Sequence, residues 1–204
     1  MSGKVGGKLI CGIGINSGEY PSNNGRNNAT EYEHWRGMLR RCQETWWVKH
    51  PAYNETSCSD NFKNYSFFYQ WCNAQVGFGN KDEKGKLWQL DKDLLIGGGR
   101  VYGEDTCVFL PQEINKLIVN NRPTRGNYPI GVHWDKRLNK FISQCNGVSE
   151  TSKHLGCFDT QEQAFQAYKA FKEGYIKRKA DEYKEQLDHR AYKALMSFKI
   201  EITD

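Results

Sequence analysis

In the first half of the chain, apolar residues recur at the spacing of an α-helix. One group follows at steps of three and four and shares one face: Tyr32, Trp35, Met38, Leu39 and Cys42. This spacing predicts a helix that begins at Thr30, where Glu33 three residues later completes a capping box. A second apolar stripe, from Phe62 to Cys72, predicts another helix that begins at Asp60.

The middle of the chain changes from helical spacing to short apolar runs. Residues 87–90 and 107–110 predict two strands, and the three glycines at 97–99 predict a turn, because glycine loses the most entropy in a regular element. Pro111 suits the first position of a helix, which residues 112–118 continue. The order is therefore strand, glycine-rich loop, strand and helix.

The last third of the chain contains three strand-like segments separated by polar turns: Ile130–Trp134, Lys140–Cys145 and Lys153–Phe158. A helix follows, capped by Asp159 or Thr160, and its apolar residues again repeat at steps of three and four. This pattern predicts a three-stranded antiparallel sheet packed on an amphipathic helix. A short final helix comes next, and Phe198–Ile202 alternates as an edge strand does.

Together these patterns predict an α+β fold in several parts. At 204 residues the chain has room for one domain of ordinary size or for two small ones. The expected division is a Gly/Ser/Asn-rich segment at 1–29, a domain of helices and a strand–strand–helix unit at 30–120, a linker at 121–127, a sheet-and-helix domain at 128–180, and a C-terminal helix and tail at 181–204.

Composition narrows the classes of protein. The mean hydropathy is -0.80, and no apolar run approaches the length of about 18 residues that a membrane-spanning helix needs. The first residues, Met1–Gly7, contain no apolar block of a signal peptide. We therefore expect a cytoplasmic protein with no membrane partner.

The seven cysteines include no Cys-x-x-Cys pair, and without a signal peptide we expect them to be reduced. Buried free thiols are the simplest interpretation. A structural zinc ion is the alternative, held by Cys42, Cys58, Cys72 and Cys107, although their spacing is not diagnostic of a zinc site.

Positive charge is concentrated in one stretch of the chain. The formal net charge is +5, and residues 121–158 carry six basic against two acidic side chains, a net of +4. Such a concentration is typical of a module that binds a polyanion. An ordinary solvated surface is the alternative.

Three motifs follow one another in this basic region: Gly131-Val132-His133-Trp134, Lys140-Phe141-Ile142-Ser143, and Leu155-Gly156-Cys157-Phe158-Asp159-Thr160 before a helix with Ala167-Tyr168. With them, residues 128–168 resemble the integrase-type DNA-binding domain of the ethylene-response-factor family. The resemblance implies that the sheet contacts double-stranded DNA in the major groove, which is about 12 Å wide. The side chains it assigns to this contact are His133, Trp134, Lys136, Arg137, Lys140, Ser143, Gln144, Lys153 and His154.

Three of these residues depart from the family pattern or allow a second interpretation. Plant members of the family carry more arginines on these strands, where this chain has His133 and Gln144. Trp134 is also compatible with a place in the hydrophobic core. Lysine and arginine contacts to phosphate would position the sheet, and only a few side chains would read bases.

Four further segments, Trp35–Cys42, Cys58–Trp71, Leu90–Asp93 and Cys107–Asn115, make residues 30–120 similar to phage-type HNH homing endonucleases. In that family a strand–strand–helix unit holds one divalent metal ion beside a histidine base. The resemblance implies that Asp91 and Asn115 bind magnesium or manganese, which take oxygen ligands and keep several waters.

The position of the family's histidine base is occupied by Lys92. A lysine acts as a base only in its neutral form, which neighbouring carboxylates disfavour. Asp93 is an alternative base, and His50 or His34 could come from elsewhere in the fold. The catalytic candidates in this strand–strand–helix unit are Asp91, Lys92, Asp93 and Asn115. A charged strand end without catalysis is the competing interpretation.

Several functions are compatible with these patterns. The first is a sequence-recognising, metal-dependent DNA endonuclease of phage or homing type, in which the metal ion stabilises the leaving oxygen. The alternative is a non-catalytic DNA-binding regulator that retains a degenerate HNH fold. A third hypothesis is a phage interaction protein whose aromatic N-terminal half binds a host protein.

Overall fold

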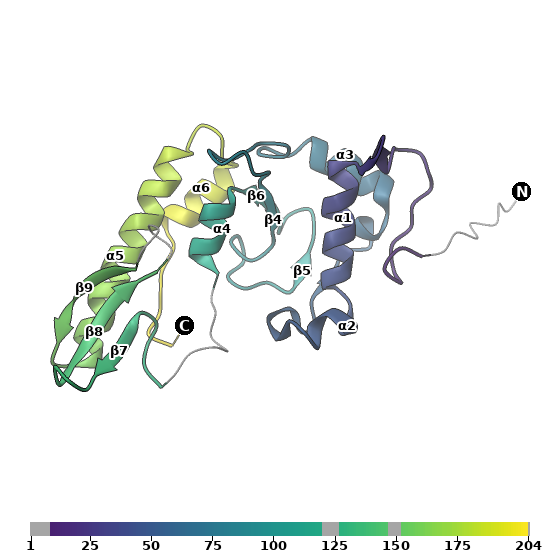
Figure 1. Ribbon diagram of the computed structural model, residues 1–204. Coiled ribbons are helices and arrows are strands. Elements are labelled where there is room, and N and C mark those ends of the chain that lie inside the picture. Colours follow the sequence, from purple (N-terminus) through teal and green to yellow (C-terminus); the bar gives the residue numbers. More distant parts are fainter. Residues whose placement is uncertain (1–8, 120–126, 147–151, 204) are drawn as a thin grey trace, which may run out of the picture. The chain divides into compact units, whose positions relative to one another are not determined.

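The computed structural model describes residues 9–119, 127–146 and 152–203 (Figure 1). By its internal contacts the chain divides into two compact units, Met1–Gln112 and Glu113–Asp204. Nearly all of the predicted linker at 121–127 lies outside the described residues. The division falls upstream of it, inside the helix that begins at Gln112.

The first unit contains the helices α1 (Thr30–Arg41), α2 (Glu44–Trp47) and α3 (Tyr65–Asn73), with 3-10 turns at Pro51–Tyr53 and Asn61–Lys63. α1 packs on α3. Trp35, Met38 and Leu39 of α1 are buried, as the apolar spacing predicts, and the start of α1 at Thr30 is confirmed.

The capping box predicted at Thr30 is wrong. The N-cap of α1 is Ala29, which makes no side-chain capping bond. The Glu33 carboxylate, which the capping box would turn back to the helix start, accepts a hydrogen bond of 2.7 Å from the Asn28 side chain. The side chain of Asn28, which precedes the N-cap, therefore holds the first turn of α1.

The second predicted helix begins later than expected. α3 starts at Tyr65 and not at Asp60, because Asn64 is its N-cap. The Asn64 Oδ1 accepts the backbone N–H of Ser66 at 2.9 Å and that of Phe67 at 3.4 Å. Such a cap satisfies N–H groups that have no partner within the helix.

In the part of the first unit that the structure describes, residues 9–112, three two-stranded sheets complete the fold: β1 (Asn23–Asn24) with β2 (Asn27–Asn28), β3 (Ser57–Cys58) with β5 (Val101–Tyr102), and β4 (Gln89–Asp91) with β6 (Val108–Leu110). The β3–β5 pair is parallel and the other two are antiparallel. β4 and β6 confirm the two strands predicted in the middle of the chain.

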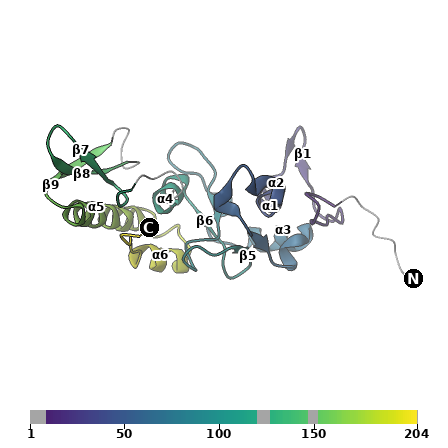
Figure 2. The ribbon, with the colours of Figure 1, turned by 90° about the horizontal axis from the view of Figure 1, so that it is seen from below.

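The second unit contains most of α4 (Gln112–Ile118), the strands β7 (Val132–Asp135), β8 (Lys140–Cys145) and β9 (Lys153–Phe158), and the helices α5 (Gln161–Glu182) and α6 (His189–Met196). The three strands form an antiparallel sheet in chain order. α5 lies across one face of this sheet (Figure 2). The predicted sheet-on-helix arrangement is confirmed.

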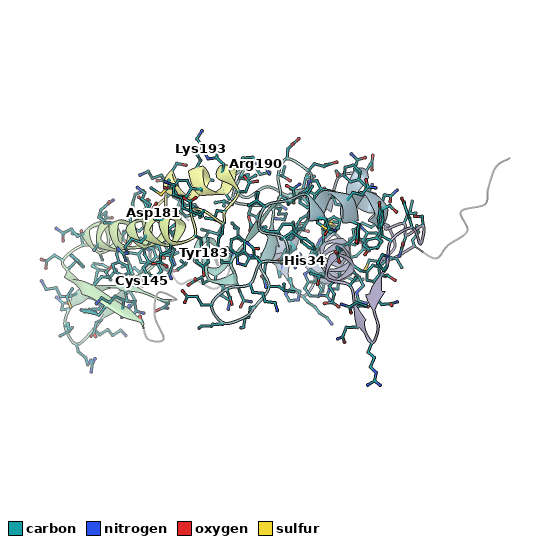
Figure 3. The ribbon with its side chains drawn as sticks, turned by 90° about the horizontal axis from the view of Figure 1, so that it is seen from above. His34, Cys145, Asp181, Tyr183, Arg190 and Lys193 are labelled. Carbon is teal, nitrogen blue, oxygen red and sulfur yellow. The ribbon has the colours of Figure 1, made fainter. Side chains whose placement is uncertain are left out.

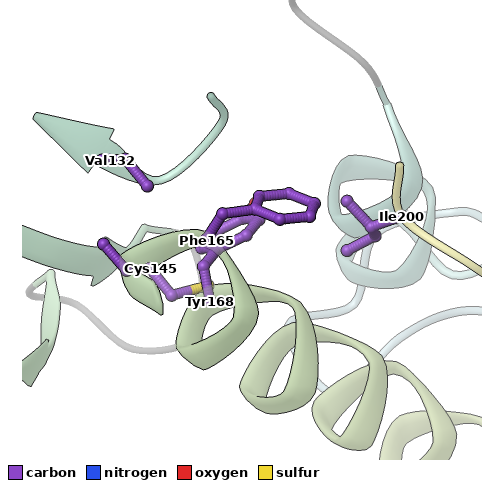
Figure 4. Close-up of a cluster of buried hydrophobic side chains, with 6 residues drawn as sticks. Val132, Cys145, Phe165, Tyr168 and Ile200 are labelled. Atoms are coloured by element: carbon purple, nitrogen blue, oxygen red, sulfur yellow. The ribbon is translucent and has the colours of Figure 1, made fainter. Parts of the chain in front are cut away.

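A buried cluster holds the sheet, α5 and the C-terminal segment together (Figure 4). Its members are Val132, Cys145, Ala164, Phe165, Tyr168 and Ile200. They come from β7, β8, α5 and the segment after α6. Phe141, Leu155 and Phe158 pack against them, so residues of all three motifs meet in one core.

The segment Phe198–Ile202 is not a strand, contrary to the alternation of its residues. Ile200 is buried in the cluster, and its backbone bonds go to side chains of α5. Its N–H donates to Glu173 Oε1 at 2.9 Å, and its carbonyl accepts from Lys169 Nζ. These bonds take the place of a strand partner.

The described elements make a mixed α+β fold of helices and small sheets, as predicted. Among the helices that the structure describes, none combines the length and the apolar character needed to cross a membrane.

Candidate functional site

The sheet of the second unit has an inner face toward α5. Residues directly opposite each other on antiparallel strands point to the same side of a sheet. Val132 lies opposite Ser143, and Trp134 lies opposite Phe141. Because Val132 and Phe141 pack in the cluster beneath α5, these four residues form the inner face.

The alternate residues form the outer face. His133 lies opposite Ile142, which in turn lies opposite Cys157, and Asp135 lies opposite Lys140. His133 and Cys157 are exposed and Lys140 is half-buried, whereas Ile142 between them is buried. The outer face is thus polar, with one aliphatic side chain at its centre.

A β-bulge beside Gln144 adds a second exposed histidine to the outer face. Gln144 lies opposite His154, and Leu155 is the extra residue of β9, which packs toward the inner cluster. His154 and Cys157 therefore share the outer face, with the His154 Nε2 and the Cys157 Sγ 3.9 Å apart.

Most of the predicted DNA-contact residues lie on or beside the outer face. The outer face holds His133, Lys140, Gln144 and His154, the turn after β7 holds Lys136 and Arg137, and Lys153 is exposed at the first position of β9. Lys140 pairs with Asp159, and Arg137 pairs with Asp135 at 3.5 Å. Exposed pairs of this kind are weak, so both cations can exchange their partner for a phosphate.

Asp135 organises the turn that presents these cations. Its Oδ1 accepts the backbone N–H of Leu138 at 3.2 Å and that of Arg137 at 2.8 Å. These bonds hold the pKa of the Asp135 carboxyl below its usual range. The Arg137 side chain is 90% exposed at the tip of the turn.

Trp134 and Ser143 lie on the inner face, contrary to their predicted place on the DNA-facing side. The Trp134 ring meets the Phe141 ring edge-on, with centroids 4.7 Å apart. Ser143 has 0% exposure, and within the described parts of the chain its Oγ has no hydrogen-bond partner. Strand alternation turns both side chains toward α5, so they are not part of the candidate DNA surface.

In the first unit, Asp91 ends β4 and is only 7% exposed. Its Oδ1 accepts the backbone N–H of Asp93 at 3.0 Å and that of Leu94 at 2.8 Å. Burial raises the pKa of the Asp91 carboxyl. One carboxylate oxygen of Asp91 therefore stabilises the turn after β4.

Lys92 is 5% exposed, and its amino group makes polar contacts with neighbouring oxygen atoms. Its Nζ lies 2.5 Å from Asp93 Oδ1 and 2.7 Å from the Gly99 carbonyl oxygen. The rings of Tyr102 and Tyr53 stand 5.6 Å and 6.0 Å from the same nitrogen. A carboxylate, a carbonyl oxygen and two aromatic rings therefore surround the Lys92 amino group and hold it in place.

Asn115 belongs to the second unit, whereas Asp91 belongs to the first. Asn115 is half-buried on α4. Its neighbour Glu113 accepts a hydrogen bond of 2.6 Å from Tyr183 and pairs with Lys179 at 3.3 Å. Within the second unit, α4 is therefore fixed to the C-terminal part of α5.

The two histidines considered as bases differ in their surroundings. His34, which Figure 3 labels, belongs to α1. Its ring meets the Phe109 ring edge-on at 5.3 Å and the Phe78 ring at 6.0 Å. Burial, with Arg41 as the second cause, lowers the pKa of His34 to about 4. His50 is exposed and stacks on Trp46 at 4.1 Å. The His34 imidazole is therefore neutral near pH 7.

The described residues contain no group of three or more His, Cys, Asp or Glu side chains that could hold a metal ion. The four cysteines considered for zinc are all described, and they do not gather in one place. Asp91 offers one carboxylate, half of it engaged by the turn, beside the Lys92 ammonium. This donor set does not by itself fit a magnesium site.

Sequence reasoning missed two parts of these sites. Cys157 shares the outer face with His154 because the bulge turns His154 to that side, and no residue pattern indicates the bulge. Tyr53 and Tyr102 surround Lys92 from a 3-10 turn and a two-residue strand, elements too short to leave a periodic signal.

Comparison with protein-family models, with curated proteins and with solved structures finds no match for this chain.

Proposed function

We propose that this protein binds double-stranded DNA through the outer face of the β7–β8–β9 sheet. The observation that carries the proposal is the separation of the two faces. α5 and the apolar cluster fill the inner face, while exposed or half-exposed polar side chains from all three strands share the outer one. The basic stretch of the chain, residues 121–158, includes this sheet.

The dimensions and chemistry of the outer face suit DNA. A narrow antiparallel sheet fits a major groove that is about 12 Å wide. Lys136 and Arg137 at the turn can bind phosphates, which fix the register of a protein on a duplex. His133, Gln144 and His154 lie on the outer face within β7, β8 and β9. Their imidazole and amide groups can form hydrogen bonds with base edges in the major groove.

The double variant Lys136→Ala/Arg137→Ala is expected to weaken DNA binding about tenfold at low salt. Because each lost phosphate contact releases one counterion fewer, the slope of log affinity against log salt should fall by about two. Fluorescence anisotropy with a short duplex at several salt concentrations measures both quantities.

The matched control is Lys184→Ala/Lys193→Ala, which removes two exposed charges from the same unit away from the sheet (Figure 3 labels Lys193). It should leave the salt slope nearly unchanged. An equal loss in both double variants would mean that net charge alone governs binding, and the outer face would lose its assignment.

Metal-dependent DNA cleavage is a second candidate function, favoured by one observation. The antiparallel pair β4–β6 is followed directly in the chain by α4, with Asp91 at the end of β4. Two observations oppose it: the ion pair of Lys92 with Asp93, and the engagement of Asp91 by the turn. The non-catalytic DNA-binding alternative therefore fits the geometry better.

Supercoiled plasmid is expected to be retarded on a gel and to remain uncut with magnesium or manganese. The assay compares the wild-type protein with Asp91→Asn, Asn115→Ala and an EDTA control. Metal-dependent nicking that disappears in Asp91→Asn or Asn115→Ala would refute the non-catalytic proposal and establish an endonuclease. Nicking that survives in both variants would identify a contaminating nuclease.

A further inference from the structure

Three side chains near the C-terminal end of α1 pack on one another, with Trp46 in contact with the other two. The His50 ring stacks on the Trp46 ring, with centroids 4.1 Å apart and planes 27° from parallel. The Arg40 guanidinium lies over the same indole, 4.5 Å from its centroid. Trp46 is half-buried, whereas Arg40 and His50 are exposed. These three residues are referred to below as the His50 platform.

Backbone and indole hydrogen bonds hold the His50 platform in place. α2 lies at the C-terminal end of α1 (Figure 1), and the Trp47 indole N–H donates to the Arg41 carbonyl at 2.8 Å. The backbone N–H of His50 donates to the Trp46 carbonyl at 3.0 Å, and Pro51 restricts the backbone of His50. The stacked ring is therefore positioned before a ligand arrives, which lowers the entropy cost of binding.

The His50 ring has one free face. Trp46 covers the other face, and within the described parts of the chain the His50 side chain makes no further ring contact and no hydrogen bond. A nucleobase can stack on an exposed imidazole, because stacking needs only a flat π-system. Inside a duplex, neighbouring bases already cover both faces of each base. The free face of His50 therefore suits an unpaired base.

Exposed cations accompany the His50 platform. Arg36 lies one turn before Arg40 on α1, and Lys49 directly precedes His50. In the described part of the first unit, none of the ion pairs involves Arg36, Arg40 or Lys49. Residues 36–50 carry four basic side chains against one acidic. These cations are available to the phosphates that flank a bound base.

We propose that the His50 platform binds single-stranded DNA. One unpaired base stacks on the His50 ring, and the flanking phosphates pair with Arg36, Arg40 and Lys49. A stacking ring beside cations is the combination by which proteins hold single strands without reading their sequence. This contact belongs to the first unit alone, and it does not rest on the duplex contact proposed for the β7–β8–β9 sheet.

The test measures the fluorescence anisotropy of a labelled oligothymidylate with the full chain. We expect the wild-type protein to bind this strand about tenfold more tightly than an abasic strand of the same length, because only the first strand offers bases for stacking. His50→Ala should lose this preference, and His50→Phe, which keeps a flat ring, should retain it. The matched control is His189→Ala, which removes another exposed histidine and should leave the preference unchanged.

The salt dependence tests the cations separately. In Arg36→Ala/Lys49→Ala the slope of log affinity against log salt should fall by about 1.4, because each phosphate contact to a single strand contributes about 0.7. The control Lys84→Ala/Lys86→Ala removes two exposed charges of the same unit, between α3 and β4, and should keep the wild-type slope.

The same measurements in the Lys136→Ala/Arg137→Ala background separate this inference from the sheet contact, since the preference for bases should persist there. Equal affinity of the wild-type protein for the oligothymidylate and the abasic strand would overturn the proposal. An unchanged preference in His50→Ala would also overturn it. So would an equal loss of duplex and single-strand binding in His50→Ala, because the surface would then bind duplex DNA.

Discussion

Replacing Gly131 with alanine is expected to destabilise the second unit by about 3 kcal/mol or more. Gly131 precedes β7 with a φ of +75°, a left-handed conformation that side chains disfavour. A Cβ built at this position would lie 2.1 Å from Cδ2 and 2.5 Å from Cγ of the buried Tyr168 ring. Backbone strain and overpacking therefore add, and neither group has room to move within the cluster beneath the sheet.

Thermal unfolding followed by circular dichroism measures the effect, since α5 supplies much of the helix signal of this unit. The matched control is Gly174→Ala in α5, where a Cβ meets nothing within 4 Å. Alanine in a helix interior is favoured over glycine, so this variant should gain roughly 0.5–1 kcal/mol. Equal melting temperatures for the two variants would contradict the close approach of Gly131 to Tyr168.

A double-mutant cycle separates the two causes. In a Tyr168→Ala background the ring is absent, and Gly131→Ala should cost only the backbone strain, about 1–2 kcal/mol. The difference between the two backgrounds is then the energy of the clash. Additive effects would mean that the φ of Gly131 accounts for the whole loss.

The contact between Gly131 and Tyr168 joins two of the sequence motifs from which the sheet and helix of the C-terminal half were predicted. Gly131 and Tyr168 stand in the first and last of the motifs on which the resemblance depends, and in the structure they touch. β8 and β9 have the predicted bounds because polar residues flank both ends of each strand in the sequence. Local residue patterns were sufficient here.

The assignment of faces was less successful, because it depends on register. The resemblance assigned Trp134 and Ser143 to the DNA surface together with residues such as His133 and Gln144. The pairing of the strands places Trp134 and Ser143 on the inner face and the other two on the outer face. The bulge beside Gln144 then shifts β9 by one residue, which moves Leu155 inward. A resemblance identifies the strands, whereas the side each residue faces follows from pairing.

In the first unit the sequence predicted the helices, but it did not predict which distant segments contact each other. The spacing of apolar residues in α1 reflects local geometry, which a periodicity captures. The parallel pair β3–β5 joins strands of two residues each that are far apart in the chain, and such pairing leaves no pattern. For the same reason the sequence placed Asp91, Lys92 and Asp93 together without showing that Lys92 is buried against Tyr102.

Acidification is expected to destabilise the first unit through His34, by about 2 kcal/mol between pH 7 and pH 4.5. Burial against Phe109 and Phe78, and then Arg41, lower the pKa of His34 from 6.5 to about 4, whereas Glu33 and Glu31 act in the opposite direction. Between these two values the unfolded chain binds the proton and the folded unit does not. Stability due to this group is therefore complete above pH 6.5 and is lost as the pH falls toward 4.

Urea unfolding followed by tryptophan fluorescence isolates this effect. Five of the six tryptophans belong to the first unit: Trp35, Trp46, Trp47, Trp71 and Trp88. The comparison is between the wild-type protein, His34→Phe and the control His50→Ala, whose ring is exposed. His34→Phe should lose about 2 kcal/mol less than the wild type between pH 7 and pH 4.5, and the control should follow the wild type. Acidic groups away from His34, such as Asp91, are unchanged in the three proteins, so the difference between the pH profiles reports on His34 and its charged neighbours. Parallel profiles would show that the His34 ring is accessible to protons in the folded unit.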